Sequence, residues 1–184
     1  MGDVTRYVVL LRGVNVGGHN NVPMATFRQL LTDLGHADVA TYLQSGNAVF
    51  SSSKRSTKAL ATEIEKEMDH VFGLTIPTLV LSQPRLAEVI AANPMAADDD
   101  DPKHLHVAFL SAKPKQGAAS KIDAAAFVPD RFVVMGDVVY LHYPNGMGRS
   151  KLDPGTVFAR MGVWSTARNW RTVNALLDLA APNQ

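Results

Sequence analysis

The sequence predicts an α+β protein made of two ferredoxin-like halves, each with the element order β-α-β-β-α-β. Three observations support this fold class. Residues 1–81 alternate short apolar runs with two stripes of helical period in that order, and a similar order returns after residue 102. A polar stretch with four consecutive aspartates separates the two. We therefore expect an N-terminal half at 1–81, a helix and acidic linker at 82–102, and a C-terminal half with a terminal helix at 103–184.

In the first half, turn and capping residues set the limits of the elements. Pro23 suits the first turn of a helix, and Gly35 and Gly73 suit helix C-caps. Ser45-Gly46-Asn47 is a hairpin turn signal, so the strands on either side should pair antiparallel. Pro77 indicates an edge or irregular strand. The expected elements are strand 7–11, helix 23–34, strands 39–44 and 48–51, helix 60–72 and strand 74–81.

The second half repeats the element order without convincing residue identity. Asn93-Pro94 ends a short helix before the acidic linker, and Gly136-Asp137 is a turn between two strands. Trp170 begins the apolar stripe of the last helix and is expected in the core rather than as a stacking platform. The expected elements are helix 84–92, strand 104–110, helix 116–126, strands 131–135 and 138–143, helix 156–161, strand 163–165 and helix 169–180.

Composition excludes several classes of protein. The chain has 184 residues, of which 46% are hydrophobic and 19% charged, as in ordinary globular proteins. It contains no cysteine, which removes disulfides, thiolate nucleophiles and the usual structural zinc sites. A net charge of +1 means that any nucleic-acid surface must be a local patch. The apolar run 8–11 is too short for a signal peptide, so we expect a cytoplasmic protein without a membrane span.

The glycine-rich stretch Leu10–Pro23 is the first candidate binding segment. Gly13, Gly17 and Gly18 allow backbone N–H groups to approach an anion, Arg12 adds a fixed charge, and a helix start follows. Asn15 adds a side-chain donor that a plain turn does not need. The stretch matches neither the P-loop nor the G-x-G-x-x-G spacing. The alternative is that the loop only connects a strand to a helix.

Three further segments carry the same donor-rich composition. Each also has a structural explanation: a hairpin turn, a solvated loop, or the beginning of a helix. Side-chain donors and the unpaired N–H groups expected at the start of the last helix would together attract an anion. These segments contribute Ser45, Gly46 and Asn47; Arg149, Ser150 and Lys151; and Arg168, Asn169 and Arg171. We expect one cleft between the halves to collect Arg12, Asn15, Ser45, Asn47, Lys151, Arg168 and Asn169.

Four segments resemble an uncharacterised bacterial family, domain of unknown function 1697. They are LLRGVNVGG at 10–18, TYLQSGNAVF at 41–50, SKL at 150–152 and RNWRTV at 168–173. The resemblance covers nearly the whole chain in the right order, and the first two segments are quite specific to the family. It implies two ferredoxin-like α+β parts and no established reaction. The sequence departs at Ala167, where the family often has a threonine, so this chain has no hydroxyl at that position.

Two function classes follow from these segments. The favoured one is binding of a small phosphorylated or carboxylated ligand or nucleotide. The alternative is a nucleic-acid-binding module, although the first strand offers only Tyr7 for base stacking. His104 and His106 alternate along a strand and suggest a metal pair, but no third ligand has diagnostic spacing, so we expect no metal site. The segments contain no nucleophile elbow or paired carboxylates. Catalytic residues, cofactors, oligomeric state and whether the protein is an enzyme are left open.

Overall fold

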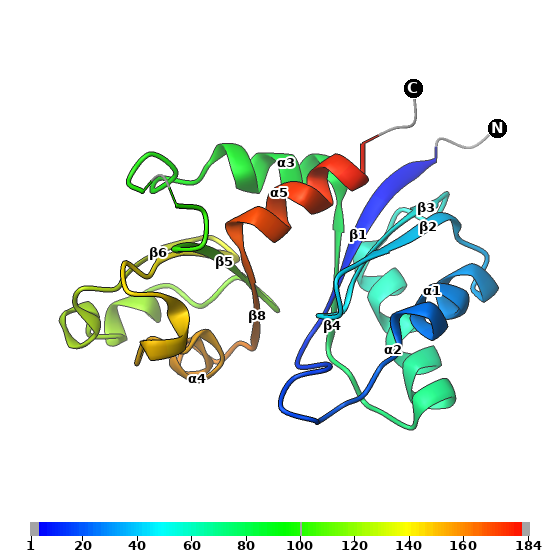
Figure 1. The fold of residues 1–184 in the computed structure, drawn as a ribbon, viewed down its shortest axis with the longest axis horizontal. Helices are drawn as coiled ribbons and strands as arrows, with labels where there is room; N and C mark the ends of the chain where they lie inside the picture. The colour runs from blue at the N-terminus through cyan, green and yellow to red at the C-terminus, as the bar shows by residue number, and fades with distance from the viewer. Residues whose placement is uncertain (1–3, 100, 182–184) are drawn as a thin grey trace. The chain divides into compact units, whose positions relative to one another are not determined.

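The computed structural model describes residues 4–99 and 101–181, which form two compact units (Figure 1). The first unit contains residues 4–88 together with 175–181, and the second contains 89–174. The chain therefore passes between units within helix α3 (Gln83–Ala91) and again within helix α5 (Trp170–Leu179). The domain limits at 82 and 102 that the sequence suggests stay a prediction. No helix among the described residues is long and apolar enough to cross a membrane.

A four-stranded antiparallel sheet forms the centre of the first unit. The strand order β2-β3-β1-β4 is that of a ferredoxin-like fold, as the sequence predicts. Two helices, α1 and α2, cover the same face of this sheet (Figure 1). β4 lies at an edge of the sheet, with Pro77 just before it. The elements are β1 (Thr5–Leu11), α1 (Met24–Asp33), β2 (Ala37–Tyr42), β3 (Asn47–Ser52), α2 (Thr57–Phe72) and β4 (Thr78–Ser82).

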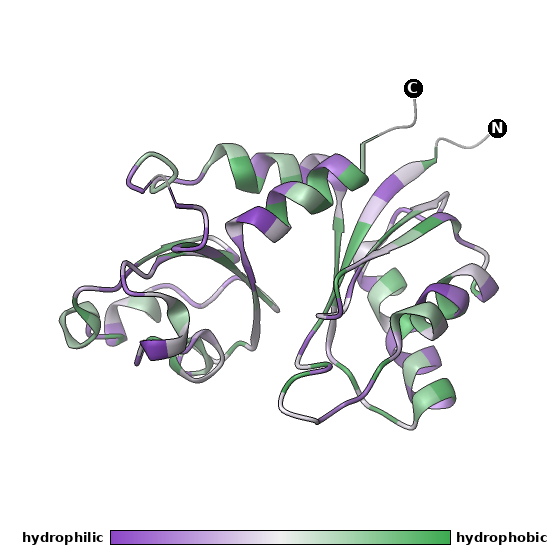
Figure 2. Ribbon diagram, in the orientation of Figure 1, coloured by the Kyte–Doolittle hydropathy of each residue, from purple (hydrophilic) through white to green (hydrophobic). Residues whose placement is uncertain are grey.

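The core of the first unit lies between the sheet and these two helices. Tyr7, Val9 and Leu11 alternate along β1 toward the helices, where they meet Phe27 of α1 and Ile64 of α2. This is the period-2 and period-3.6 patterning that the sequence predicts. Figure 2 shows the same division on the ribbon, with hydrophobic residues on one side of α1 and α2 and hydrophilic residues on the other.

Residues on the opposite face of the β1 strand connect the sheet to the end of α5. The guanidinium of Arg6 donates through Nη1 to the Asp38 carbonyl and to Ser51 Oγ, both at 3.0 Å. Its Nη2 donates to the carbonyl of Leu179 in the last turn of α5, also at 3.0 Å. One side chain thus holds together segments 173 positions apart in sequence.

The second unit repeats the same sheet topology. Its strand order is β6-β7-β5-β8, and every pairing is antiparallel. The predicted fold class, two ferredoxin-like halves with an additional C-terminal helix, is confirmed. One face of this sheet packs against α4 and the loop before β6, with Phe158 and Leu141 in that core. The elements are β5 (Leu105–Leu110), β6 (Arg131–Met135), β7 (Val138–His142), α4 (Pro154–Ala159) and β8 (Ser165–Asn169).

The helix expected at 116–126 is replaced by two short 3-10 helices, η1 (Ala119–Lys121) and η2 (Ala124–Phe127). Asp123 divides them, because its side chain accepts a hydrogen bond from the backbone N–H of Ala125 and caps a new turn. Ile122, at the end of η1, has an extended backbone. The local capping interaction outweighs the weak helical pattern of the segment.

The last strand and helix also differ from expectation. β8 extends to Asn169 rather than ending at residue 165, because its backbone pairs with β5 along the whole length from Ser165 opposite Leu110 to Asn169 opposite His106. Helix α5 begins only at Trp170, whose side chain is half-buried. Arg168 therefore lies in a strand and not at a helix start.

Candidate functional site

In the first unit, the glycine-rich loop and the β2–β3 turn lie against each other. Asn15 joins them: its Nδ2 donates to the carbonyls of Val22, at 2.8 Å, and Gln44, at 2.7 Å. Its Oδ1 accepts the backbone N–H of Val22 at 2.8 Å. Every polar atom of this amide is thus used inside the fold. The sequence marks Asn15 as a donor for a ligand, whereas in the structure its side chain holds two loops together.

The β2–β3 turn is fixed in the same way. Gly46 has φ +77°, and its carbonyl accepts the backbone N–H of Leu11 at 2.8 Å. A Cβ atom there would lie 2.6 Å from Val14 Cγ2. Asn47 is fully buried, and its Nδ2 donates to the Tyr42 carbonyl and to Ser45 Oγ at 3.0 and 2.9 Å. Close packing therefore accounts for Gly46 and Asn47.

Arg12 and the loop glycines differ in their exposure to solvent. Arg12 is half-buried, and its backbone N–H donates to the Pro77 carbonyl at 2.9 Å. Gly13, Gly17 and Gly18 are exposed and have φ values of +64°, +59° and +76°. Three exposed glycines of the loop thus lie in the left-handed region of backbone conformation, in the same segment as Arg12.

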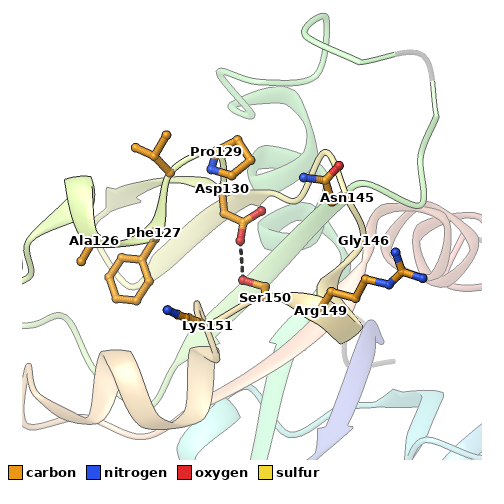
Figure 3. A pocket seen from close by; sticks show the side chains of 10 residues that line it. Ala126, Phe127, Pro129, Asp130, Asn145, Gly146, Arg149, Ser150 and Lys151 are labelled. Atoms are coloured by element: carbon orange, nitrogen blue, oxygen red, sulfur yellow. Dashed lines mark hydrogen bonds between the residues drawn. The ribbon is translucent and has the colours of Figure 1, made fainter.

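In the second unit, Ser150 and Lys151 line a cavity of about 210 Å³ (Figure 3). The cavity lies between the segment that leads into β6 and the loop that follows β7. Figure 3 shows Asp130 and Ser150 facing each other, with Lys151 and Arg149 on either side of the pair. The lining residues are Ala126, Phe127, Val128, Pro129, Asp130, Asn145, Gly146, Arg149, Ser150 and Lys151.

A serine–carboxylate pair forms the polar centre of this cavity. Ser150 Oγ donates to Asp130 Oδ2 at 2.5 Å and accepts the backbone N–H of Leu152 at 2.8 Å. Asp130 is buried, with 9% of its surface exposed. Nearby, burial and then the charges of Asp130 and Asp153 raise the pKa of Tyr143, whose hydroxyl donates to the Leu152 carbonyl. The loop 150–152 is thus fixed by buried hydrogen bonds.

The two cations of the same loop are arranged differently. The side chains of Arg149 and Lys151 are exposed and form no hydrogen bond or ion pair with any residue in 4–99 or 101–181. A fixed backbone thus presents two uncompensated positive charges at the edge of a cavity. Sequence analysis finds these cations, but it misses Asp130, which lies twenty positions away from Ser150 and carries no local motif.

Arg168 has a position that the sequence does not predict, whereas Asn169 lies at the start of the last helix, as expected. Arg168 is 8% exposed on β8, and its Nη1 donates to Thr166 Oγ1 and to the Ala167 carbonyl, both at 2.8 Å. Burial lowers the pKa of Arg168 to about 10. Asn169 Oδ1 accepts the N–H of Thr172 at 2.8 Å and so satisfies one of the donors at the start of α5. The prediction that Arg168 lies at the start of the last helix is wrong, because Arg168 belongs to β8.

The acidic linker holds a second polar cluster. Asp99 Oδ2 accepts hydrogen bonds from His104 Nδ1 at 2.8 Å and His142 Nε2 at 2.9 Å, and Asp99 Oδ1 accepts the Asp101 N–H at 2.9 Å. The bond from His142 and then those from Asp101 and His104 hold the pKa of Asp99 well below its usual value. Arg131 pairs with neighbouring Asp98 at 2.8 Å. The linker is therefore fastened to the sheet.

The two histidines that alternate in sequence do not act together. His104 bonds to Asp99, whereas the ring of His106 packs edge-on against Tyr143 with centroids 5.2 Å apart. His106 Nδ1 is buried and has no hydrogen-bond partner among the described residues, and burial lowers the pKa of His106 to about 4. Within 4–99 and 101–181, no group of three His, Asp or Glu side chains is placed to hold a metal ion.

The candidate residues thus form one group in the first unit and two in the second. The loop 12–18 and the turn 45–47 meet within one unit, while the cavity at 149–151 and the strand end at 168–169 belong to the other. That all of them converge on one cleft stays a prediction.

Comparisons with known proteins agree with the resemblance seen in the sequence. A solved structure described as a conserved bacterial protein, SP0830 from Streptococcus pneumoniae, is similar with a TM-score of 0.72 and 24% identity, covering 97% of this chain and 100% of that one. At this identity, the likeness shows the fold alone. Comparison with curated proteins found no significant match. The family model described as protein of unknown function (DUF1697) matches residues 4–140, and the chain belongs to that family.

Proposed function

We propose that the protein binds a small phosphorylated or carboxylated ligand, or a nucleotide through its phosphate. The observation that carries the proposal is the pair of cations without internal partners, Arg149 and Lys151, at the edge of the cavity in the second unit. Cations that support a fold normally pair with carboxylates or carbonyls, whereas a charged hydrogen bond to a ligand needs free donors.

The size of the cavity limits the ligand. About 210 Å³ is below the range of about 300–1,000 Å³ that is typical of drug-sized molecules. The cavity therefore suits a phosphate or carboxylate on a short carbon chain, or one end of a larger molecule. Arg149 offers a planar fork for two anion oxygens, and Lys151 offers a point charge.

The first unit supplies a second set of donors that we propose for the same ligand class. Asn15 and Asn47 are committed to loop packing, and this part of the proposal uses the exposed glycine N–H groups beside Arg12. We propose that Arg12 and these N–H groups contact the same ligand as Lys151 and Arg168.

The nucleic-acid alternative finds no support in side-chain exposure. RNA-binding sheets of this fold present aromatic rings for base stacking. Tyr7 is 2% exposed and points to the helical side, with its hydroxyl bonded to the Lys54 carbonyl. None of the large hydrophobic side chains found exposed in the described chain is aromatic. We therefore do not adopt this function.

Titration calorimetry with inorganic phosphate, acetate, propyl phosphate and adenosine monophosphate tests the proposal. Each charged hydrogen bond contributes about 1.5–3 kcal/mol, so Arg149→Gln and Lys151→Gln should each weaken binding by roughly 10–100-fold. Lys115→Gln is the matched control, because Lys115 is exposed in the same unit and outside the cavity lining. Absence of binding by every probe, or equal loss in the control, would refute the proposal.

A further inference from the structure

Asp130 is the group in the cavity that a simple anion does not explain. Its carboxylate lies among the lining residues and is 9% exposed. No ion pair within the described chain compensates its charge, even though Arg149 and Lys151 line the same cavity. A buried carboxylate is costly unless its oxygens receive hydrogen bonds.

Only one oxygen of this carboxylate has a partner. Oδ2 accepts from Ser150 Oγ, while Oδ1 accepts no hydrogen bond from residues 4–99 or 101–181. Oδ1 is also absent from the fully enclosed polar atoms of the described chain that lack partners, so it retains access to solvent. This oxygen can therefore accept a hydrogen bond from a ligand that enters the cavity.

Ser150 has one hydroxyl proton and cannot donate it to both the carboxylate and the ligand. Its one proton goes to Asp130, and its oxygen accepts the N–H of Leu152. The hydroxyl proton is thus used by the carboxylate and is not available to the anion. The groups left for a ligand are the Oδ1 acceptor, the cations on either side, and the exposed amide of Asn145 (Figure 3).

We propose that this cavity selects a small anion that carries a hydroxyl group next to its charged group, such as a hydroxylated alkyl phosphate or a hydroxy acid. The inference rests on the proposed anion binding and adds a second point of recognition. The phosphate or carboxylate binds Arg149 or Lys151, and the hydroxyl donates to Asp130. An anion without a hydroxyl meets the same carboxylate without a hydrogen bond and is disfavoured by its charge.

Two probes of equal charge and chain length separate these contacts: glycerol 3-phosphate and propyl phosphate. By calorimetry, the wild type should bind glycerol 3-phosphate at least tenfold more tightly, because only this probe has hydroxyls that can donate a hydrogen bond to the carboxylate. Asp130→Asn should reduce this preference to less than threefold. Lys151→Gln should weaken both probes by a similar factor and leave the preference intact.

Ser150→Ala is the second variant, in case Asp130→Asn fails to fold, as judged by circular dichroism and melting. It keeps the carboxylate and removes the competing donor, so the preference for glycerol 3-phosphate should persist or increase. If Ser150→Ala abolishes the preference, or if the wild type binds both probes equally, the inference is wrong while anion binding stands. If neither probe binds, the proposed function itself fails.

Discussion

Replacing Gly46 by alanine tests the packing between the glycine-rich loop and the β2–β3 turn. At φ +77°, an alanine costs about 1–2 kcal/mol relative to glycine. The added Cβ would lie 2.6 Å from Val14 Cγ2 and 2.7 Å from Leu11 Cβ, which are closer than carbon atoms pack. Relieving such contacts costs about 1–3 kcal/mol more. We expect Gly46→Ala to lower the free energy of unfolding by roughly 2–5 kcal/mol.

Gly18→Ala provides the matched control. Gly18 has φ +76°, but a Cβ there would meet no atom within 4 Å. Its substitution should cost only the conformational part, about 1–2 kcal/mol. Urea denaturation of both variants, followed by circular dichroism, measures the difference. If the two variants lose the same stability, the close approach of Gly46 to Leu11 and Val14 has no energetic weight, and the structural explanation of this turn is refuted.

Three further predictions concern charge and pH. Asp99→Asn should destabilise the protein at neutral pH. Because folding lowers the pKa of Asp99, the carboxylate contributes its full stabilisation above about pH 3.8 and loses it as the pH falls further. Urea titrations should therefore show the stabilities of the wild type and the variant converging only in acid. The pKa of His106 falls from 6.5 to about 4 on folding, so the unfolded state binds more protons between these values and stability should drop as pH falls through this range; His106→Phe should flatten that part of the pH profile. Arg12→Ala should weaken a bound phosphate roughly 10–100-fold and Arg12→Lys should weaken it less, since lysine keeps the charge but not the planar fork; a melting temperature that falls in Arg12→Ala with unchanged affinity would contradict this.

Much of the fold follows from local patterns in the sequence. The apolar alternation in 7–11 and the stripe that ends at Gly73 identify β1 and α2 because one face of each must be buried. The helix predicted at 116–126 does not form, because one aspartate cap outweighs a weak helical period. β8 is longer than predicted because its partner is β5, some sixty residues earlier, and pairing at that range leaves no local signal.

The candidate site is predictable only in part, for the same reason. The sequence marks Asn15 and Asn47 as polar residues near glycines, but their hydrogen bonds to distant carbonyls appear only in three dimensions. It marks Ser150 and Lys151 as donors, but the carboxylate that orients Ser150 comes from another loop. Residue type indicates which groups can bind a ligand, whereas tertiary contacts decide which of them are still available.

The contact between Arg6 and the carbonyl of Leu179 has a consequence for how the protein folds during synthesis. Residues 89–174, which form the whole second unit, are translated between the two parts of the first unit. The strands of the sheet that contains β1 are therefore synthesised before the end of α5 exists, and until then Arg6 lacks one of its acceptors. Contacts of such long sequence separation form late because closing a long loop costs entropy. We expect the nascent first unit to remain incomplete until the second unit has been synthesised. Completion of the first unit therefore requires that residues 89–174 do not prevent the end of α5 from reaching the first sheet.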